Sequence, residues 1–188
     1  MSDDVFSSDS LILIKNGDKK AFEGLFRASC PLLVSFAYRF VRDIAIAEEL
    51  VQDVYVSIWQ NRAGIDPHGN FKIYLLKAVK NKALNYLKHQ KTISNLLIDI
   101  ELSSVEIKTP HDIMKDDEIG KAIAQSLASL PEKCRLVFAL NRFDGFSYRQ
   151  IAELLDISLK TVETHMGRAL KHLRRGLAHL LTIAIWIS

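Results

Sequence analysis

The side chains best suited to chemistry in this sequence are the basic ones between Ser147 and Arg175. This stretch reads SYRQIAELLDISLKTVETHMGRALKHLRR, which predicts two short helices joined by a tight turn. In the second helix, apolar residues recur at the spacing of a buried stripe and basic residues gather on the opposite side. A helix packed on one side and cationic on the other suits the DNA major groove. An ordinary helical hairpin with a solvated face has the same spacing and stays an alternative.

Both faces of that second helix are defined by residue type. The predicted buried stripe contains Leu159, Val162, Met166, Ala169, Leu170 and Leu173. The predicted polar face contains Lys160, Thr164, Arg168, Lys171, Arg174 and Arg175. Ser147 and Gln150 have the spacing of a capping box, and Ser158 is suited to cap the second helix. Together these signals predict a helix-turn-helix.

A second cationic helix is predicted over residues 71–91, which carry six lysines and no acidic residue. Lysines at this density neutralise phosphates, and the amides of Asn81 and Asn85 are able to hydrogen-bond base edges or backbone. Tyr74 and Tyr86 are able to stack on unpaired bases. A lysine-solvated helix whose aromatic residues belong to the core explains the pattern equally well. The polar sector of this helix contains Lys77, Lys80, Asn81, Lys88 and Lys91.

An acidic segment that ends in tryptophan, AEELVQDVYVSIW, spans residues 47–59. Its predicted core stripe contains Ala47, Leu50, Val51, Val54 and Ile58. Val56 and Trp59 fall outside that stripe, among acidic and amide side chains. Apolar residues in such surroundings favour a protein-binding surface. The alternative is that another helix of the same protein covers them.

The elements that must carry these segments are helices, because glycine and proline number only 8 and 4 in 188 residues and the dominant apolar period is helical. A chain of this length forms one or two domains. We expect an all-α fold with two small helical domains, residues 1–93 and 117–188, joined by a linker over residues 94–116. Net charge is only +3, but it is unevenly distributed, since residues 99–118 hold seven acids against two lysines.

Local signals predict where the helices of the first domain begin. We expect N-caps at Asp18, Asp43 and Asn70. Pro31 is suited to the first position of a new helix, because proline there loses no hydrogen bond. Residues 62–70, RAGIDPHGN, are rich in turn formers and predict a loop.

Catalytic and metal chemistry are not predicted. The sequence contains no recognisable nucleophile–base arrangement and no glycine-rich phosphate loop. His165, His172 and His179 recur every seven residues, which separates neighbours by about 10.5 Å on a helix, too far to share one metal. We expect these histidines at the boundary of the core or facing phosphates, and we expect no metal and no cofactor.

The location of the protein is predicted from its cysteines and its ends. Cys30 and Cys134 lie far apart, and no signal peptide precedes them, which favours a reduced cytoplasmic setting. The apolar C-terminal run LAHLLTIAIWIS is shorter than the roughly 20 residues that span a bilayer. We expect it to cap a groove in its own domain, with no direct membrane insertion.

Taken in order along the chain, these segments resemble one protein family. An acidic helix ending in tryptophan is followed by a lysine-rich helix, an acidic tether and the runs LPEKCRLVF, GFSYRQIAELLDIS and TVETHMGRALKHLR. From about residue 11 to 180, this order closely resembles an extracytoplasmic-function (ECF) sigma factor of bacterial RNA polymerase. The run EKCRLVF and the apolar tail look most like the Bacteroidetes branch of that family.

The resemblance implies that the N-terminal domain binds the core polymerase and the −10 promoter element. Residues 47–60 match the segment that binds the β′ clamp helices, which implies contacts at Glu48, Glu49, Gln52, Asp53, Val56 and Trp59. Residues 71–91 match the −10 segment, which implies melted-strand contacts at Lys77, Lys80, Asn81, Asn85 and Lys88. The acidic tether matches the linker that threads into the RNA exit path.

The resemblance assigns the C-terminal domain to the −35 promoter element, with residues 159–173 in the major groove. It implies base readout by Lys160, Thr164 and Arg168, with Thr161 and Glu163 nearer the edge. It implies phosphate contacts at Arg149, Lys171, Arg174 and Arg175. Asp156 stands where glycine is common in the turn, and aspartate tolerates the left-handed conformation better than most residues.

The resemblance therefore implies a promoter-specificity subunit with no enzymatic activity of its own. Its implied partners are the core polymerase, through β′ and β, promoter DNA, and an anti-sigma factor that holds it inactive. A free-standing helix-turn-helix regulator that binds operators as a dimer is the alternative, but residues 1–95 lack the strands and acidic pocket of a receiver domain. A third class, a helical adaptor with no DNA role, is disfavoured by the two cationic helices.

Overall fold

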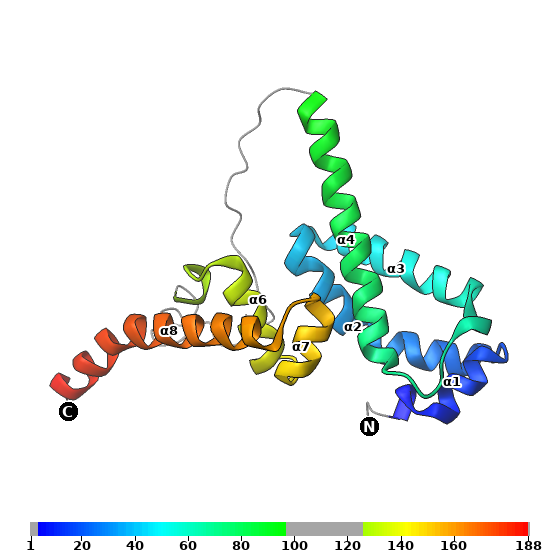
Figure 1. The fold of residues 1–188 in the computed structure, drawn as a ribbon, viewed down its shortest axis with the longest axis horizontal. Helices are drawn as coiled ribbons and strands as arrows, with labels where there is room; N and C mark the ends of the chain where they lie inside the picture. Colours follow the sequence, from blue (N-terminus) through cyan, green and yellow to red (C-terminus); the bar gives the residue numbers. More distant parts are fainter. Residues whose placement is uncertain (1–3, 97–125, 188) are drawn as a thin grey trace. The chain divides into compact units, whose positions relative to one another are not determined.

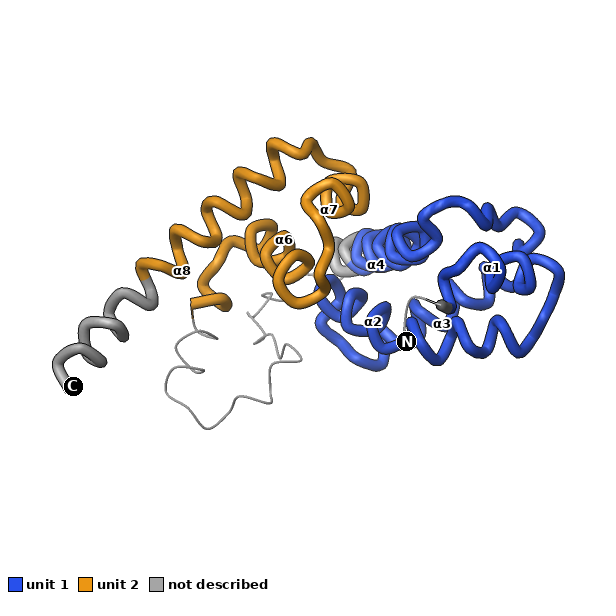
Figure 2. The backbone as a smooth tube through the Cα atoms, turned by 90° about the horizontal axis from the view of Figure 1, so that it is seen from below, with its two compact units in different colours: residues 1–105 blue, residues 106–188 orange. Residues whose placement is uncertain are grey.

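The computed structural model describes residues 4–96 and 126–187, all of whose regular elements are helices (Figure 1). The predicted all-α class is therefore confirmed over the described residues. The chain divides into two compact units, residues 1–105 and 106–188 (Figure 2). The predicted linker 94–116 lies outside the described residues except for 94–96, which belong to a helix. The proposed domain limits stay a prediction.

Over its described residues, the N-terminal unit is built from three long helices and three short ones. Its elements are η1 (Asp4–Phe6), α1 (Ser8–Lys15), α2 (Lys19–Val41), α3 (Ile44–Gln60), η2 (Arg62–Gly64) and α4 (Phe71–Leu96). Helix α2 packs against both α3 and α4, and α3 packs against α4. Side-chain oxygens of Asp18, Asp43 and Asn70 accept hydrogen bonds from the first turns of α2, α3 and α4, which confirms all three predicted caps.

The prediction that Pro31 begins a helix is wrong, because α2 runs unbroken through it. Proline has no N–H and so removes one backbone hydrogen bond from a helix interior, at a cost of about 3 kcal/mol or more. Leu25 is buried before the proline, and Leu33 and Phe36 are buried after it. Each such side chain gains about 1.5–3 kcal/mol on burial, so one continuous apolar face outweighs the lost bond.

The C-terminal unit contains α6 (Glu132–Arg142), α7 (Tyr148–Leu155) and α8 (Leu159–Ile187). Helices α6 and α7 both pack against α8. The predicted capping box is present, with Ser147 Oγ accepting from the Gln150 N–H and Gln150 Oε1 accepting from the Ser147 N–H. Ser158 Oγ accepts from the Thr161 N–H at 3.0 Å and caps α8. The predicted helix-turn-helix is thus formed by α7 and α8.

The buried stripe of α8 is as predicted except at its start. The side chains of Val162, Met166, Ala169 and Leu173 are buried, and that of Leu170 is half-buried. Leu159 is 40% exposed, so its assignment to the buried stripe is wrong. Helical side chains lean toward the N-terminus and cover the preceding turn. Leu159 is the first residue of α8 and has no preceding turn to cover.

Candidate nucleic-acid interface

One face of α8 presents the predicted DNA-reading side chains to solvent. The exposed members are Lys160, Glu163, Thr164, Arg168, Lys171, Arg174 and Arg175, and Arg149 of α7 is exposed as well. Thr161 is half-buried, because its hydroxyl and backbone N–H both lie against the capping Ser158. The structure thus brings this set together on one short helix pair, with apolar residues behind it.

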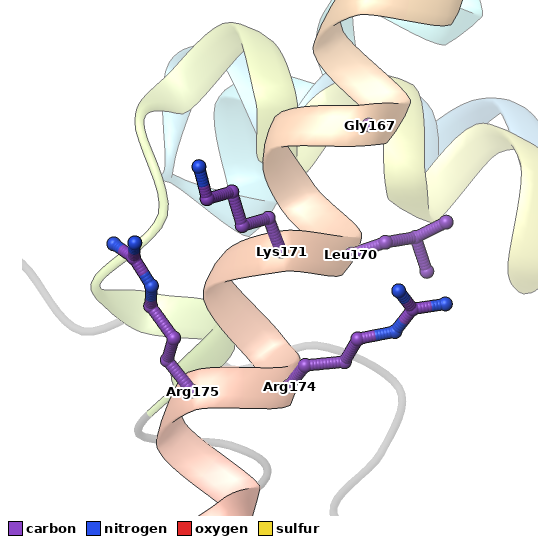
Figure 3. Close-up of a pocket in the computed structure, with 5 residues that line it drawn as sticks. All are labelled: Gly167, Leu170, Lys171, Arg174 and Arg175. Atoms are coloured by element: carbon purple, nitrogen blue, oxygen red, sulfur yellow. The ribbon is translucent and has the colours of Figure 1, made fainter.

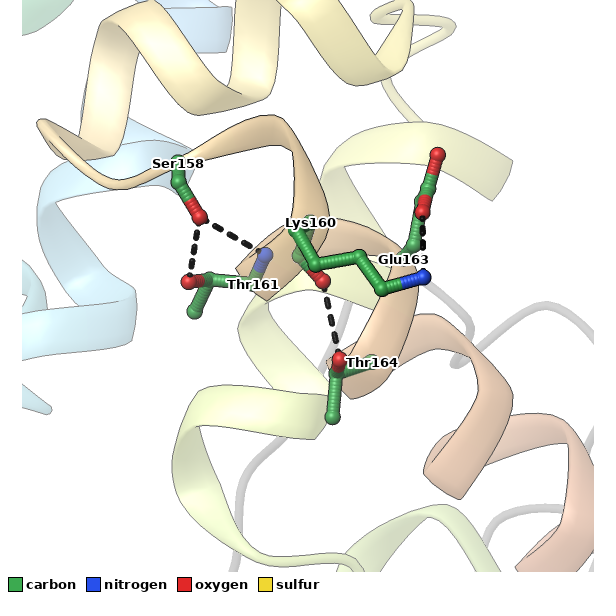
Figure 4. Close-up of polar contacts among 5 residues, drawn as sticks. All are labelled: Ser158, Lys160, Thr161, Glu163 and Thr164. Carbon is green, nitrogen blue, oxygen red and sulfur yellow. Dashed lines mark hydrogen bonds and ion pairs between the residues drawn. The ribbon is translucent and has the colours of Figure 1, made fainter.

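Four polar contacts fix the start of this face, one of them the bond from the Thr161 N–H to Ser158 Oγ (Figure 4). The hydroxyls of Ser158 and Thr161 lie 2.8 Å apart. Lys160 Nζ lies 3.4 Å from Glu163 Oε2 in an ion pair within the helix. The Thr164 hydroxyl donates to the Lys160 carbonyl at 2.8 Å, which leaves the lone pairs of its oxygen as acceptors. The first turn of α8 is therefore organised before any DNA is present.

Further along α8, three basic side chains project from one helix around a shallow hollow (Figure 3). Lys171, Arg174 and Arg175 line this hollow of about 460 Å³, together with Gly167 and the half-buried Leu170. Flexible cations on an exposed helix surface suit phosphates, which require charge but no fixed pattern of donors and acceptors.

Two histidines of α8, His165 and His172, face α6 and the residues that precede it. The His165 Nδ1 lies 3.5 Å from the Cys134 Sγ, and the His172 Nε2 lies 2.8 Å from the Ser129 Oγ. Burial, followed by the nearby charges of Arg168 and Lys133, lowers the pKa of His165. Of the two predicted roles, the boundary position therefore applies to His165 and His172. The side chain of His179 lies outside the described residues.

On α4 the predicted polar residues divide into two groups. Asn81, Asn85 and Lys88 are exposed, whereas Lys77 and Lys80 are half-buried. The side chain of Lys91 lies outside the described residues. Of the two aromatic candidates for base stacking, Tyr74 is 54% exposed, whereas Tyr86 is half-buried with its hydroxyl accepting from Gln90 Nε2. These residues give α4 a cationic, amide-bearing outer side.

Helix α3 confirms its predicted core stripe and exposes the other side. Ala47, Leu50, Val51, Val54 and Ile58 are all buried. Glu48, Glu49, Gln52, Asp53 and Val56 are exposed, with Val56 at 55%. Asp53 forms an ion pair with Lys82 of α4, with 2.9 Å between Oδ2 and Nζ.

Trp59 is only partly exposed, and its role in binding a partner stays a prediction. Its ring centroid lies 4.9 Å from that of Phe22 on α2, and the Arg62 guanidinium lies over the indole ring, 4.7 Å from the centroid. A helix of the same unit therefore covers part of the indole. Val56, one turn earlier, is an exposed apolar side chain of α3, as is Ile44 at the start of the helix.

Sequence reasoning missed a hollow of about 240 Å³ where the 62–70 loop enters α4. Ile65, Asn70, Phe71 and Tyr74 line it, and the rings of Phe71 and Tyr74 are stacked with centroids 5.6 Å apart. The available signal was a loop with two glycines followed directly by two aromatic residues three positions apart.

Within the described ranges no helix has the length and apolarity required to span a bilayer.

Comparisons with known proteins follow the same division of the chain. Residues 25–93 match the family model "Sigma-70 region 2", and residues 120–173 match "Sigma-70, region 4". The chain is similar to the ECF RNA polymerase sigma factor SigK of Mycolicibacterium vanbaalenii, with 29% identity covering 85% of this chain and 83% of that protein. It is similar to SigW of Bacillus subtilis, with 25% identity covering 89% and 94% of the two chains.

The fold resembles two solved structures. CnrH in complex with the cytosolic domain of CnrY has a TM-score of 0.63 at 22% identity, covering 93% of this chain and 98% of that one. The sigma factor RpoE in complex with the anti-sigma factor NepR, from Bartonella quintana, has a TM-score of 0.62 at 20% identity, covering 85% and 98%. The free-standing regulator is not favoured, since a sigma region accounts for the N-terminal unit. The chain belongs to the ECF sigma factors, and it is a sigma factor of RNA polymerase that acts in transcription initiation.

Proposed function

We propose that the two units divide promoter recognition between them, with α8 reading the −35 element and α4 contacting the −10 element. The observation that carries this proposal is the exposed cationic face of α8, organised by the cap at Ser158 and packed from behind on α6 and α7. The residues proposed to read bases, Lys160, Thr164 and Arg168, lie on the side of α8 that does not pack against α6 and α7.

At the −35 element, Lys160, Thr164 and Arg168 would contact base edges, because they occupy the first three turns of the exposed face. Arg168 would donate two hydrogen bonds to one guanine, the commonest specific contact of arginine. Thr161 and Glu163 would lie nearer the edge of the site. Phosphate contacts would come from Arg149, Lys171, Arg174 and Arg175.

At the −10 element, α4 would hold the melted strand along its outer side. The proposed contacts are Lys77, Lys80, Asn81, Asn85 and Lys88. The hollow beside Tyr74 would receive an unpaired base, since the exposed ring already rests on Phe71 and offers a face for stacking. Stacking of this kind contributes about 1–3 kcal/mol per base.

The exposed side of α3 is proposed to bind the core polymerase at the β′ clamp helices. Its contacts would be Glu48, Glu49, Gln52, Asp53 and Val56, with the uncovered edge of Trp59. An anti-sigma factor is a further proposed partner, because the related RpoE structure contains one, NepR. A cytoplasmic location is proposed because the sigma regions assign the chain to a family that acts on RNA polymerase. The Bacteroidetes branch is proposed on the run EKCRLVF and the apolar C-terminal tail.

Site-specific photo-cross-linking in the assembled holoenzyme tests this assignment. A benzophenone side chain at Thr164 should cross-link to −35 DNA, one at Asn85 to the −10 strand, and one at Val56 to β′. The same group at Arg27, an exposed position on α2, serves as the control and should give none of these products. Cross-links from Thr164 and Asn85 to protein instead of DNA would overturn the proposal.

A further inference from the structure

Helix α1 is tied to the 62–70 loop by one contact between residues 50 positions apart in the sequence. Lys15, the last residue of α1, donates from Nζ to the backbone carbonyl of Ile65 at 3.0 Å. Ile65 is itself buried, at 6% exposure, and is one of the residues that line the hollow beside Tyr74. Lys15 therefore holds one wall of the hollow from behind without lining it.

The same stretch of chain is fastened at a second point. Arg62 donates from Nη1 to the Trp59 carbonyl at 2.9 Å and its guanidinium lies over the indole ring. Gly17, just after α1, has φ +91°, and a Cβ added there would lie 3.6 Å from Arg62 Nε. The turn after α1 thus comes close to the start of the loop, while Lys15 reaches its middle.

The opposite wall of the hollow is fixed by helix α4. Asn70 Oδ1 accepts from the Ile73 N–H at 3.2 Å, and Tyr74 stacks on the buried Phe71. One wall is therefore part of a capped helix, whereas the other is a loop that is held by short-range turns of its own and by the contact from Lys15. Lys15 and Arg62 both hold this loop through charged donors, which form the stronger class of hydrogen bond.

We infer that Lys15 is a positioning residue for −10 recognition. It holds the Ile65 carbonyl, and with it the loop wall, at the separation from Tyr74 that an unpaired base requires. This inference rests on the proposed function of the hollow and names a residue that sets its geometry without touching DNA. Loss of the ammonium frees the wall to move, so fewer molecules present a hollow ready for a base.

The test compares holoenzymes containing wild-type sigma factor, Lys15→Met, Lys15→Arg and the control Lys20→Met. Methionine retains the length and apolar stem of lysine but has no donor, and Lys20 is an exposed lysine on the adjoining α2. Binding is measured to a fork-junction promoter whose −10 strand is already single, alongside binding to core polymerase and the thermal unfolding midpoint of each variant. Lys15→Met should weaken fork-junction binding about three- to tenfold, the range expected for one ordinary intramolecular hydrogen bond, because the donor Lys15 is exposed to water.

The accompanying variants separate positioning from general stability. Lys15→Arg should retain most of the binding because a donor remains, whereas Lys20→Met should match the wild type. The double variant Lys15→Met/Tyr74→Ala should bind no more weakly than Tyr74→Ala alone, because both changes act on one hollow. Additive losses, or a loss in Lys15→Met that accompanies an equal loss of core binding, would overturn the inference.

Failure of this inference and failure of the proposed function give different results. If Tyr74→Ala and Asn85→Ala weaken fork-junction binding while Lys15→Met does not, the positioning role is wrong and the −10 surface stands. If none of the three variants weakens fork-junction binding, α4 is not the −10 surface.

Discussion

Lys160 Nζ and Glu163 Oε2 lie 3.4 Å apart, one turn from each other on the exposed face of α8. The side chains are 85% and 47% exposed, so water competes with the pair and the pair adds little to stability. The ion pair matters for DNA recognition, because both residues belong to the face of α8 that is proposed to read the −35 element. Glu163 competes with a base for the ammonium of Lys160, and Glu163 repels any phosphate that comes near it.

Glu163→Gln should therefore raise non-specific DNA binding and lower discrimination. The substitution removes a negative charge from the DNA-facing side and frees Lys160, so affinity for unrelated duplex should rise about two- to fivefold at low salt. Fluorescence anisotropy with specific and scrambled −35 duplexes measures both effects. Glu23→Gln breaks a comparable exposed ion pair with Arg27 on α2 and should change neither affinity. An equal rise in DNA affinity for Glu163→Gln and Glu23→Gln would show that the effect depends on net charge and not on the position of Glu163.

Arg168→Ala and Lys171→Ala should have different effects on DNA binding: the first should lower sequence discrimination, and the second should lower affinity for all sequences. If Arg168 reads a base, its loss costs about 1–3 kcal/mol on the correct −35 sequence and much less on substituted ones, so discrimination falls. If Lys171 meets a phosphate, its loss weakens binding equally across sequences and reduces the slope of log K against log salt by about 1. Holoenzyme binding to a set of single-base −35 substitutions distinguishes the two. Equal effects from both variants would mean that the faces of α8 are assigned wrongly.

The parts of this fold that depend on neighbouring residues could be predicted from the sequence. Asp18, Asp43 and the Ser147–Gln150 box cap helices through bonds that span two or three residues, so the signal and its effect lie together. The cationic face of α8 was predictable for the same reason, since helical periodicity alone places Arg168 and Lys171 on the outside.

The parts that depend on distant packing could not be predicted in this way. Pro31 has the signature of a helix start, and only the burial of residues on both sides of it makes α2 continuous. The partial cover of Trp59 comes from Phe22, more than thirty positions earlier in the sequence, through a contact that no period reveals. The hollow beside Tyr74 likewise needs Ile65 and α4 in place.

Asp156→Gly should stabilise the C-terminal unit. Asp156 ends α7 in the left-handed conformation, with φ 59° and ψ 47°, where a side chain is strained and glycine is not. We expect the free energy of unfolding to rise by about 0.5–1 kcal/mol, because the relieved strain exceeds the added entropy of the unfolded chain. Glu153→Gly, inside α7, should lower it by about 1 kcal/mol or more. Chemical denaturation followed by circular dichroism measures both, and a loss of stability in Asp156→Gly would contradict the reason given.

Ser29 and Tyr55 should make the stability of the N-terminal unit sensitive to alkaline pH. Their hydroxyl oxygens lie 2.6 Å apart in the core, and burial raises the pKa of Tyr55 to about 12. The ordinary value is about 10, so the neutral phenol is favoured in the folded state. Its contribution to stability is complete below about pH 10 and is lost as the pH rises from about 10 to 12. Unfolding measured across this interval should show the decline, and Tyr55→Phe should reduce it.

Ser29→Ala tests the same contact at neutral pH. The change leaves the buried Tyr55 hydroxyl without this partner, and we expect a loss of about 1–3 kcal/mol in the free energy of unfolding. Ser57→Ala, at an exposed position on α3, should stay within about 0.5 kcal/mol of the wild type. A loss no larger than that of the control would mean that the hydroxyl pair does not contribute to stability.

The most direct test of the central claim is run-off transcription with purified core polymerase and a panel of genomic fragments. Addition of this sigma factor should produce transcripts from particular promoters, and Arg168→Ala should reduce them most where the −35 element is intact. Replacing the −35 or the −10 element of an active promoter should abolish its transcript. If no fragment yields a promoter-dependent transcript, or if transcripts persist when both elements are replaced, the two-surface account of this protein is contradicted.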